Sequence, residues 1–285
     1  MRLPCPSDRN GSGGSPSNRD SMIATPLGRH SPVIDAVRAL RTKSGRREAG
    51  RYAIEGLTML EEALDAGLEP LAIYATDRGL ASLDALVAAG RFRNDRTFLI
   101  DGRAMAKVSD LETPPGLLAV LPLVETPLAT LLAGGEPAVV LAGVADPGNA
   151  GTLLRSAEIF GITRAVFARD AVEPHNPKVV RATMGALFRM TIASADASDL
   201  LAAARANGYR IVAATRDGIA LGAFRFPERA LIAIGNERHG ISAWLPTYDD
   251  GVTIPQTGRG ESLNASVAGG IILYAFSQDV SHKTF

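Results

Sequence analysis

The sequence predicts an α/β protein of two units, the second a doubly wound parallel sheet with helices on both faces. Short apolar runs alternate with segments of helical spacing along most of the 285 residues, as in βα units. The run AVVLAGV at residues 138–144 is apolar throughout, which is typical of a parallel strand buried on both faces. Polar, glycine-containing turns follow several of the predicted strands.

The composition is that of a folded protein, with 46% hydrophobic and 21% charged residues. The 30 basic and 30 acidic residues give a formal net charge of +0, which excludes a protein that holds nucleic acid by bulk charge but not one with a local basic patch. A single cysteine, Cys5, excludes an intrachain disulfide framework and a cysteine zinc site. No apolar run approaches the roughly 18 residues of a membrane-spanning helix, so we expect no membrane contact and a cytoplasmic location.

Residues 1–29 differ from the rest of the chain. They are rich in Ser, Gly, Pro, Asn and Arg and poor in large apolar residues, so we expect a disordered extension. The extension lacks the continuous apolar segment of a secretory signal. Two alternatives stay open: an organellar transit peptide, against which Asp8 and Asp20 argue, and a functional start at Met22 instead of Met1.

Residues 30–123 are expected to form a small α/β unit. Val33, Val37 and Leu40 have helical spacing, as do Leu57, Leu60 and Leu64, which precede a capping glycine. The expected elements, in chain order, are helices at 32–40 and 57–67, a strand at 71–76, a helix at 82–90 and strands at 97–101 and 112–123.

A connector at residues 124–137, with a short helical piece at most, leads to the second unit at 138–285. Its apolar runs alternate with helix-spaced segments throughout. The expected strands are 138–144, 165–168, 190–193, 209–215, 230–235 and 251–254, and the expected helices are 149–160, 178–187, 199–206 and 262–276.

Three polar segments follow strands of the second unit, at residues 146–161, 232–240 and 254–270. Ligands bind at that edge of an open α/β sheet. Each segment also has a purely structural interpretation. Asn149 would cap a helix that carries a solvated Arg155, Glu237 would begin a helix, and Ser262 would cap the last helix with Asn264 in its first turn.

The paired glycines Gly269 and Gly270 lie inside that last helix, where each costs about 1 kcal/mol relative to alanine. They indicate close approach of another part of the backbone. The common nucleotide motifs G-x-G-x-x-G and G-x-x-x-x-G-K-[ST] and the hydrolase elbow G-x-S-x-G are absent from the sequence. No group of His, Asp and Glu has metal-ligand spacing, so no metal site is expected.

Taken in order, the three segments resemble the three motifs of the SpoU/TrmH RNA 2′-O-ribose methyltransferases of the SPOUT superfamily. The motifs are N-x-G-x-x-x-R-x-A at 149–157, G-N-E-x-x-G at 235–240 and I-P-x…G-E-S-L-N-x-S-V-A at 254–268. The segment HNPKVVRATMGALF at 175–188 also matches, and residues 52–67 and 112–120 resemble the L30e-like substrate-binding domain of the family. The resemblance covers about residues 30–278. The sequence departs from the pattern at Gln256, where many members have an apolar residue, and in its N-terminal extension.

The resemblance implies transfer of a methyl group from S-adenosylmethionine to a ribose 2′-hydroxyl, most often of 23S rRNA. It also implies a homodimer and a deep trefoil knot in the second unit, with close backbone contact around Gly258, Gly260, Gly269 and Gly270. The implied cofactor contacts are Thr215, Gly235, Ile254 and Leu263.

By the same resemblance, the catalytic residues are Asn149, Arg155, Glu237, Ser262 and Asn264, with Arg155 at the centre. A guanidinium is effectively always protonated. We therefore expect Arg155 to clamp a phosphate or the developing alkoxide, with the other residues orienting Arg155 and the ribose. The proton would leave through phosphate or water.

Residues 38–52 carry six cations against the single acid Glu48. They are Arg38, Arg41, Lys43, Arg46, Arg47 and Arg51. In an arbitrary protein this would be a solvated basic surface. Beside an L30e-like domain it predicts contacts to RNA phosphates.

Several alternatives stay open. Within the same class, the enzyme would modify tRNA instead of rRNA, or would be a resistance enzyme of an antibiotic producer. A non-catalytic RNA-binding member of the family is a second class. A small-molecule nucleotide-binding enzyme is a third, and it leaves the basic segment without a role. The sequence does not give the target nucleotide.

Overall fold

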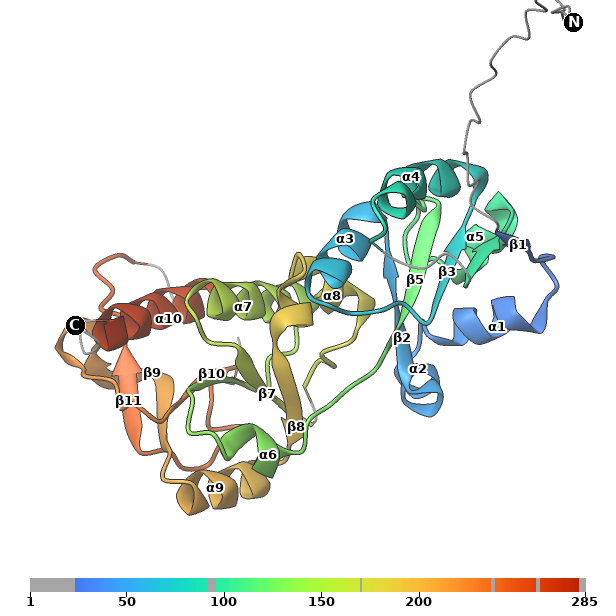
Figure 1. Cartoon of the computed structure of the whole chain (residues 1–285). Coiled ribbons are helices and arrows are strands. Elements are labelled where there is room, and N and C mark those ends of the chain that lie inside the picture. Colours follow the sequence, from blue (N-terminus) through green and yellow to red (C-terminus); the bar gives the residue numbers. More distant parts are fainter. Residues whose placement is uncertain (1–23, 92–95, 170, 237–238, 260–261, 282–285) are drawn as a thin grey trace, which may run out of the picture.

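A computed structural model describes residues 24–91, 96–169, 171–236, 239–259 and 262–281. Residues 1–23 of the expected disordered extension lie outside these ranges. Within residues 24–29 the expectation is wrong, because Thr25 and Pro26 form a strand that pairs with Phe98 and Leu99. The described chain forms two sheets, each covered by helices, that lie side by side (Figure 1). The predicted mixed α/β class is confirmed.

The first unit has a five-stranded mixed sheet in the order β1-β4-β3-β5-β2. β5 is antiparallel to both neighbours, whereas β1, β4 and β3 are parallel. The strands are β1 (Thr25–Pro26), β2 (Arg51–Glu55), β3 (Ala72–Ala75), β4 (Thr97–Leu99) and β5 (Leu117–Pro122).

Helices cover both faces of this sheet (Figure 1). Successive residues of β5 alternate between the faces: Leu118 and Val120 pack under α1 and α5, and Leu117 and Leu121 join the core under α3 and α4. The helices of the unit are α1 (Pro32–Ala39), α2 (Lys43–Ala49), α3 (Leu57–Asp65), α4 (Asp77–Ala88) and α5 (Gly102–Val108). β2, α2 and α5 were not predicted as separate elements, because each is short.

The connector is fixed to both units. Leu123 N donates to Gly50 O at 2.9 Å, and Thr126 N donates to Ile192 O at 2.7 Å. Its short helix α6 (Leu128–Leu132) buries Leu131 and Leu132 against the second sheet. The connector is therefore anchored to the second unit at Thr126 and through α6, whereas Val124 is 67% exposed.

The second unit is a six-stranded sheet in the order β11-β9-β10-β6-β7-β8, parallel at every pairing. This confirms the predicted doubly wound parallel sheet. Its strands are β6 (Ala138–Ala142), β7 (Arg164–Ala168), β8 (Thr191–Ala195), β9 (Arg210–Ala220), β10 (Ala230–Gly235) and β11 (Asp250–Thr253).

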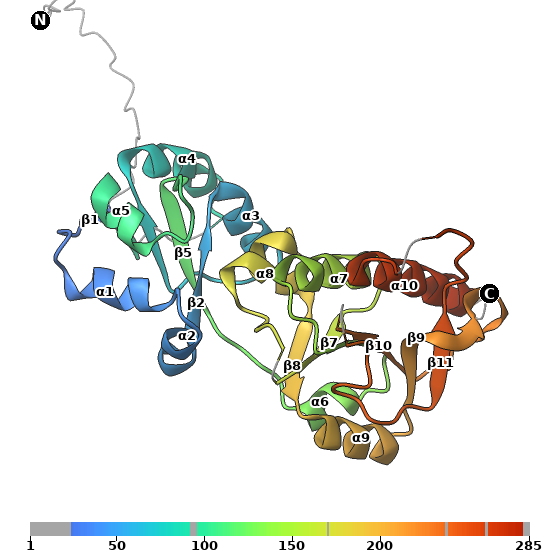
Figure 2. The ribbon, with the colours of Figure 1, turned by 180° about the vertical axis from the view of Figure 1, so that it is seen from behind.

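The central strand β6 is buried on both faces, as its apolar run predicted. Val139 and Leu141 face the core beneath α7 and α10, and Ala138 and Val140 face α6 and α9 (Figure 2). The helices are α7 (Pro147–Ile159), α8 (Pro177–Ala182), α9 (Ala197–Ala206) and α10 (Ala265–Ser281), with 3₁₀ turns at Ala186–Arg189 and Leu221–Ala223.

Several helix boundaries differ from the prediction by two to five residues, and two of them have a clear cause or consequence. α8 stops at Ala182, because Met184 and Gly185 take positive φ angles of 50° and 92° that no α-helix contains. α10 begins at Ala265 instead of Ser262. The trefoil knot stays a prediction. Among the described residues, no helix combines the length and the hydropathy needed to span a membrane.

Candidate active site

The order of strands in the second sheet creates a crevice. The chain leaves β6 towards β7 and β8, then returns so that β10 pairs with the other edge of β6. Ligands bind where the order reverses in this way, outside the carboxyl ends of the strands. Here the two ends are joined by Asn236, whose Nδ2 donates to Gly143 O at 2.9 Å.

A cleft of about 950 Å³ opens at this edge, between the ends of β9, β10 and β11 and the start of α10. This lies within the range of small-molecule and cofactor sites, roughly 300–1,000 Å³. The structure brings the four predicted cofactor residues together in its wall: Thr215, Gly235, Ile254 and Leu263. Ser262, one of the predicted catalytic residues, lines it too.

The lining suits a nucleoside-sized ligand. Thr215 Oγ1 is buried and has no hydrogen-bond partner within the described chain, and a buried polar atom of this kind normally has one. Ile234, Ile254 and Ile272 supply apolar walls for a ring. The residues present therefore fit a cofactor that has both a flat ring and hydrogen-bonding groups.

Gly235 also has a structural role beside its place in the cleft wall. A Cβ there would lie 2.5 Å from backbone atoms of Gly240 and Ile241. The missing side chain therefore makes room for the protein's own turn, where Asn236 pairs with Gly240, and Gly235 contributes backbone to the cleft wall.

Two predicted catalytic residues are in direct contact across the rim. Asn264 Nδ2 donates to Asn149 Oδ1 at 3.0 Å. The structural interpretations of the motifs were wrong in detail. Asp146, not Asn149, caps α7, accepting from Asn149 N at 2.7 Å, and Asn264, not Ser262, caps the start of α10.

α7 and α10 run parallel, because Asn149 contacts Asn264 near their amino-terminal ends and Phe160 contacts Tyr274 further along both segments. A Cβ at Gly269 would overlap Leu153 Cδ2, and the rings of Phe160 and Tyr274 lie 5.7 Å apart. Gly269 is therefore needed for a close approach, but side chains make that approach and not the backbone that was predicted.

The other glycines of that prediction behave differently. A Cβ at Gly258 would meet no atom of the described chain within 4 Å, and a Cβ at Gly270 would lie at an ordinary distance, 3.5 Å, from Ser156. The prediction is wrong at these two positions. Gly260 lies outside the described residues.

Arg155 lies on the exposed side of α7, six residues after Asn149. It does not line the cleft, and it makes no hydrogen bond or ion pair with any described residue. Its guanidinium is thus available for an external ligand. Glu237, the remaining predicted catalytic residue, lies outside the described residues.

Five of the six predicted RNA contacts are exposed on one unit, and we call them the basic face. They are Arg38, Arg41, Lys43, Arg47 and Arg51. Within the described ranges none of them forms an ion pair, whereas most arginines of the second unit do. The positive charge of the basic face is therefore not neutralised by neighbours.

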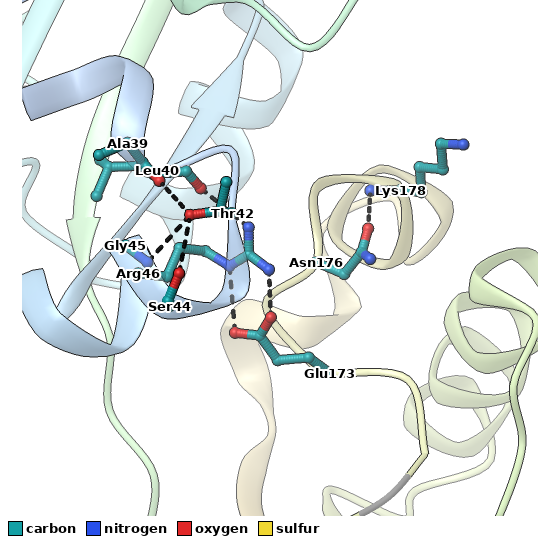
Figure 3. A network of polar contacts seen from close by, with 9 residues as sticks. All are labelled: Ala39, Leu40, Thr42, Ser44, Gly45, Arg46, Glu173, Asn176 and Lys178. Atoms are coloured by element: carbon teal, nitrogen blue, oxygen red, sulfur yellow. Dashed lines mark hydrogen bonds and ion pairs between the residues drawn. The ribbon is translucent and has the colours of Figure 1, made fainter. Parts of the chain in front are cut away.

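The prediction for Arg46 is corrected. Its side chain is buried, with 2% exposure, and is paired with Glu173 of the second unit (Figure 3). It cannot meet a phosphate there. A cation that was not predicted, Lys107, lies beside Arg41: Arg41 Nη1 donates to Lys107 O at 3.4 Å. Lys107 lies on α5, a helix that was not predicted either.

A cleft with both apolar walls and polar groups, at the reversal of a parallel sheet, is typical of an enzyme that binds a nucleotide-like cofactor. A separate unit with unneutralised cations adds a surface for a polyanion. Among the described residues, no group of three or more His, Cys, Asp and Glu is placed to hold a metal ion.

Comparison with known proteins gives the family. Residues 136–274 match the SpoU rRNA methylase family and residues 31–119 match the MRM3-like substrate-binding domain. The chain is 30% identical over 267 residues to an uncharacterized tRNA/rRNA methyltransferase of Mycobacterium bovis, covering 88% of this chain and 90% of the relative. The protein belongs to the SpoU rRNA methylase family, whose members are S-adenosylmethionine-dependent methyltransferases.

Two further proteins are similar over almost their whole length. The 23S rRNA (guanosine(2553)-2′-O)-methyltransferase RlmP of Bacillus subtilis is 27% identical over 237 residues, which are 82% of this chain and 92% of the relative. The crystal structure of an AdoMet-bound rRNA methyltransferase from Sinorhizobium meliloti superposes with a TM-score of 0.77 at 26% identity, covering 90% of this chain and 98% of that one.

Proposed function

We propose that this protein transfers a methyl group from S-adenosylmethionine to a ribose 2′-hydroxyl of rRNA, with 23S rRNA as the expected substrate. The observation that carries the proposal is the convergence of Thr215, Gly235, Ile254 and Leu263 on one cleft. The similar Sinorhizobium meliloti enzyme binds AdoMet, and the similar Bacillus subtilis enzyme methylates 23S rRNA. We propose a cytoplasmic location, which agrees with an rRNA substrate.

The cofactor supplies an electrophilic methyl group on a sulfonium. Thr215 and the backbone at Gly235 would hold its polar groups, and Ile254 and Leu263 would enclose its ring.

Arg155 is the proposed clamp for RNA. Its guanidinium stays protonated at working pH, so it stabilises a phosphate or the developing alkoxide and does not accept the proton of the 2′-hydroxyl. Phosphate or water accepts that proton. Asn149 and Asn264 hold the ends of α7 and α10 together, and we assign Glu237 and Ser262 to orienting the ribose.

The basic face is the proposed RNA-recognition surface. Its five cations lack ion-pair partners within the described chain, so each is available to a phosphate. Contacts of this kind position RNA without reading its sequence. We propose that the two units correspond to functional domains: an RNA-binding domain at 30–123 and a methyltransferase domain at 138–285, with 124–137 as linker.

We also propose a homodimer formed through α7 and α10, the helices of the methyltransferase domain that carry the catalytic motifs and, in the family pattern, the knot. Val267, Ile271 and Tyr274 lie at helical spacing on α10 and are 50%, 38% and 51% exposed, and Ile159 on α7 is 64% exposed. Such an apolar stripe on a surface is typical of an interface. Sedimentation velocity is expected to show a dimer, and a monomer for Tyr274→Lys; a wild-type monomer would contradict the proposal.

The direct test of function is methyl transfer from labelled S-adenosylmethionine to rRNA, combined with ribose-methylation mapping of total RNA from a deletion strain and its parent. Loss of one 2′-O-methyl in 23S rRNA is the expected result. Loss of a 2′-O-methyl group from a tRNA would show that tRNA is the substrate. Antibiotic sensitivity of the deletion strain would identify a resistance enzyme. Cofactor binding without transfer to any RNA would overturn catalysis in favour of a non-catalytic RNA-binding protein.

A further inference from the structure

One arginine of the basic segment points inward. Arg46 Nε donates to Glu173 Oε1 at 3.1 Å, Nη2 donates to Glu173 Oε2, and Nη1 donates to Leu40 O at 2.9 Å (Figure 3). Both side chains are buried, Arg46 with 2% and Glu173 with 7% exposure. A bidentate pair of this kind fixes distance and angle together, since the planar guanidinium fits a carboxylate in one orientation.

The pair connects the basic face to the methyltransferase domain. Arg46 lies on α2, the helix that also carries the exposed Lys43 and Arg47. Glu173 precedes α8, and α8 packs tightly on α7, where a Cβ at Gly151 would overlap Ala182 Cβ. Only α8 therefore lies between the buried pair and α7, the helix that carries Arg155.

Further contacts cross the same junction, among them the ion pair of Arg181 Nη2 on α8 with Asp110 Oδ2 at 3.0 Å. Arg189 bridges the units, donating to Glu62 Oε2 at 2.8 Å and to Glu158 Oε1 at 2.7 Å, and Glu158 lies on α7 one turn after Arg155. The rings of Tyr52 on β2 and His175 lie 4.7 Å apart. The apolar core is continuous across the junction as well, so the two units meet as packed surfaces.

We propose that Arg46 and Glu173 are positioning residues: their ion pair sets the span between the basic face and Arg155 and thereby selects which ribose of the bound RNA reaches the cleft. This inference rests on the proposed function. Folded rRNA is itself stiff. An RNA held on the basic face therefore presents its 2′-hydroxyl correctly only if the distance from the basic face to Arg155 matches the corresponding distance within the RNA. A looser junction would keep RNA affinity but reduce the fraction of aligned complexes, and a misplacement of about 1 Å can cost on the order of a hundredfold in rate.

The test separates geometry from activity. Spin labels at Ala85→Cys on α4 and Ala202→Cys on α9, both exposed, in a Cys5→Ser background, report the distance between the units. Glu173→Gln is expected to broaden that distance distribution and to lower kcat on a folded rRNA fragment roughly tenfold to a hundredfold, with unchanged KM for RNA and unchanged Kd for S-adenosylmethionine. Glu48→Gln is the matched control, because it makes the same chemical change at an exposed position of α2.

Arg46→Lys is the second variant, for the case that Glu173→Gln does not fold. It keeps the charge but loses the two-pronged geometry, so the distance distribution is again expected to broaden, by a smaller amount. A distribution that stays narrow in a folded variant overturns the inference, as does a broadened one with full kcat and unchanged choice of ribose. If the wild-type protein methylates no rRNA, the proposed function fails, whereas the distance measurement still decides whether the pair sets the span.

Discussion

Asn264 and Asn149 share a hydrogen bond of 3.0 Å although 115 positions separate them in the sequence. The same Asn264 side chain caps α10: its Oδ1 accepts from Ser266 N at 2.9 Å and from Val267 N at 3.3 Å. One amide group thus makes two kinds of contact: its oxygen fixes the start of α10, and its nitrogen binds Asn149 on α7.

Aspartate at position 264 separates the two contacts. Asn264→Asp keeps an acceptor for the helix cap but loses the donor to Asn149, so stability is expected to be retained while methyl transfer falls by about tenfold or more through misalignment of α7. Asn264→Ala loses the cap as well, at about 1 kcal/mol of unfolding free energy. Thermal unfolding and turnover, measured on both variants, check this. Full turnover in Asn264→Asp would show that the link to Asn149 has no catalytic use.

The cofactor residues were implied by the family resemblance, and the strand order of the structure explains why they can meet. Thr215, Gly235 and Ile254 come from three neighbouring parallel strands or their ends, and such ends meet at one edge of the sheet. The apolar run of β6, by contrast, predicted burial on both faces. A local sequence pattern is sufficient to predict burial where, as in β6, every residue of the strand has the same environment.

Arg46 shows what local pattern cannot predict. Its neighbours in sequence are cations of the same kind, and only the presence of Glu173, 127 residues away, makes it buried. The contact of Asn149 with Asn264 is of the same long-range type. Short elements such as β2 and α5 were missed for a different reason, since five to seven residues hold too little periodicity to distinguish helix from strand.

Gly269 and Gly270 are expected to respond oppositely to alanine. A Cβ at Gly269 would overlap Leu153 Cδ2, so Gly269→Ala must push α10 away from α7 and is expected to destabilise the protein by about 1–3 kcal/mol. Gly270→Ala places its methyl 3.5 Å from Ser156, an ordinary contact, and gains up to about 1 kcal/mol of helix propensity. Urea unfolding of the two variants compares them directly. Equal effects would contradict this packing of α10 on α7.

Arg155→Ala is expected to lower turnover by roughly a hundredfold or more, the usual loss when one donor to a developing anion is removed. Arg155 is exposed and lies outside the cleft wall, so folding and S-adenosylmethionine affinity should not change. Arg155→Lys keeps the charge without the planar fork and should recover part of the activity. Methyl transfer and calorimetric cofactor titration measure the two properties. Near-wild-type turnover in Arg155→Ala would remove this residue from the mechanism.

Stability is expected to fall below about pH 6.5 because of His175. Burial, helped by the charge of Arg46, lowers the pKa of His175 from 6.5 to about 4. Between these values the unfolded chain binds the proton and the folded one does not, so unfolding free energy drops by up to about 1.4 kcal/mol per pH unit as the pH falls from 6.5 towards 4.

His175→Phe removes this titration and keeps a ring against Tyr52. Because carboxyl groups titrate in both proteins, the quantity to measure is the difference between wild type and variant, by urea unfolding from about pH 7.5 to about pH 4.5. The difference should grow in favour of the variant as the pH falls. Parallel stability curves would show that His175 is protonated in the folded protein as readily as in the unfolded one.

Neutralising part of the basic face should weaken RNA binding and its dependence on salt together. In a triple change of Lys43, Arg47 and Arg51 to glutamine, the slope of log K against log salt is expected to lose about 0.7–0.9 for each phosphate contact removed. The cleft lies in the other unit, so S-adenosylmethionine affinity should stay the same. A matched control replaces Arg91 and Arg169, exposed arginines that are already paired with Asp65 and Asp196, because neutralising a paired cation removes no counterion-releasing contact. Filter binding at several salt concentrations measures the slopes. The assignment of RNA binding to the first unit would be contradicted by a triple variant with the wild-type slope. A triple variant that loses cofactor affinity instead would contradict it as well.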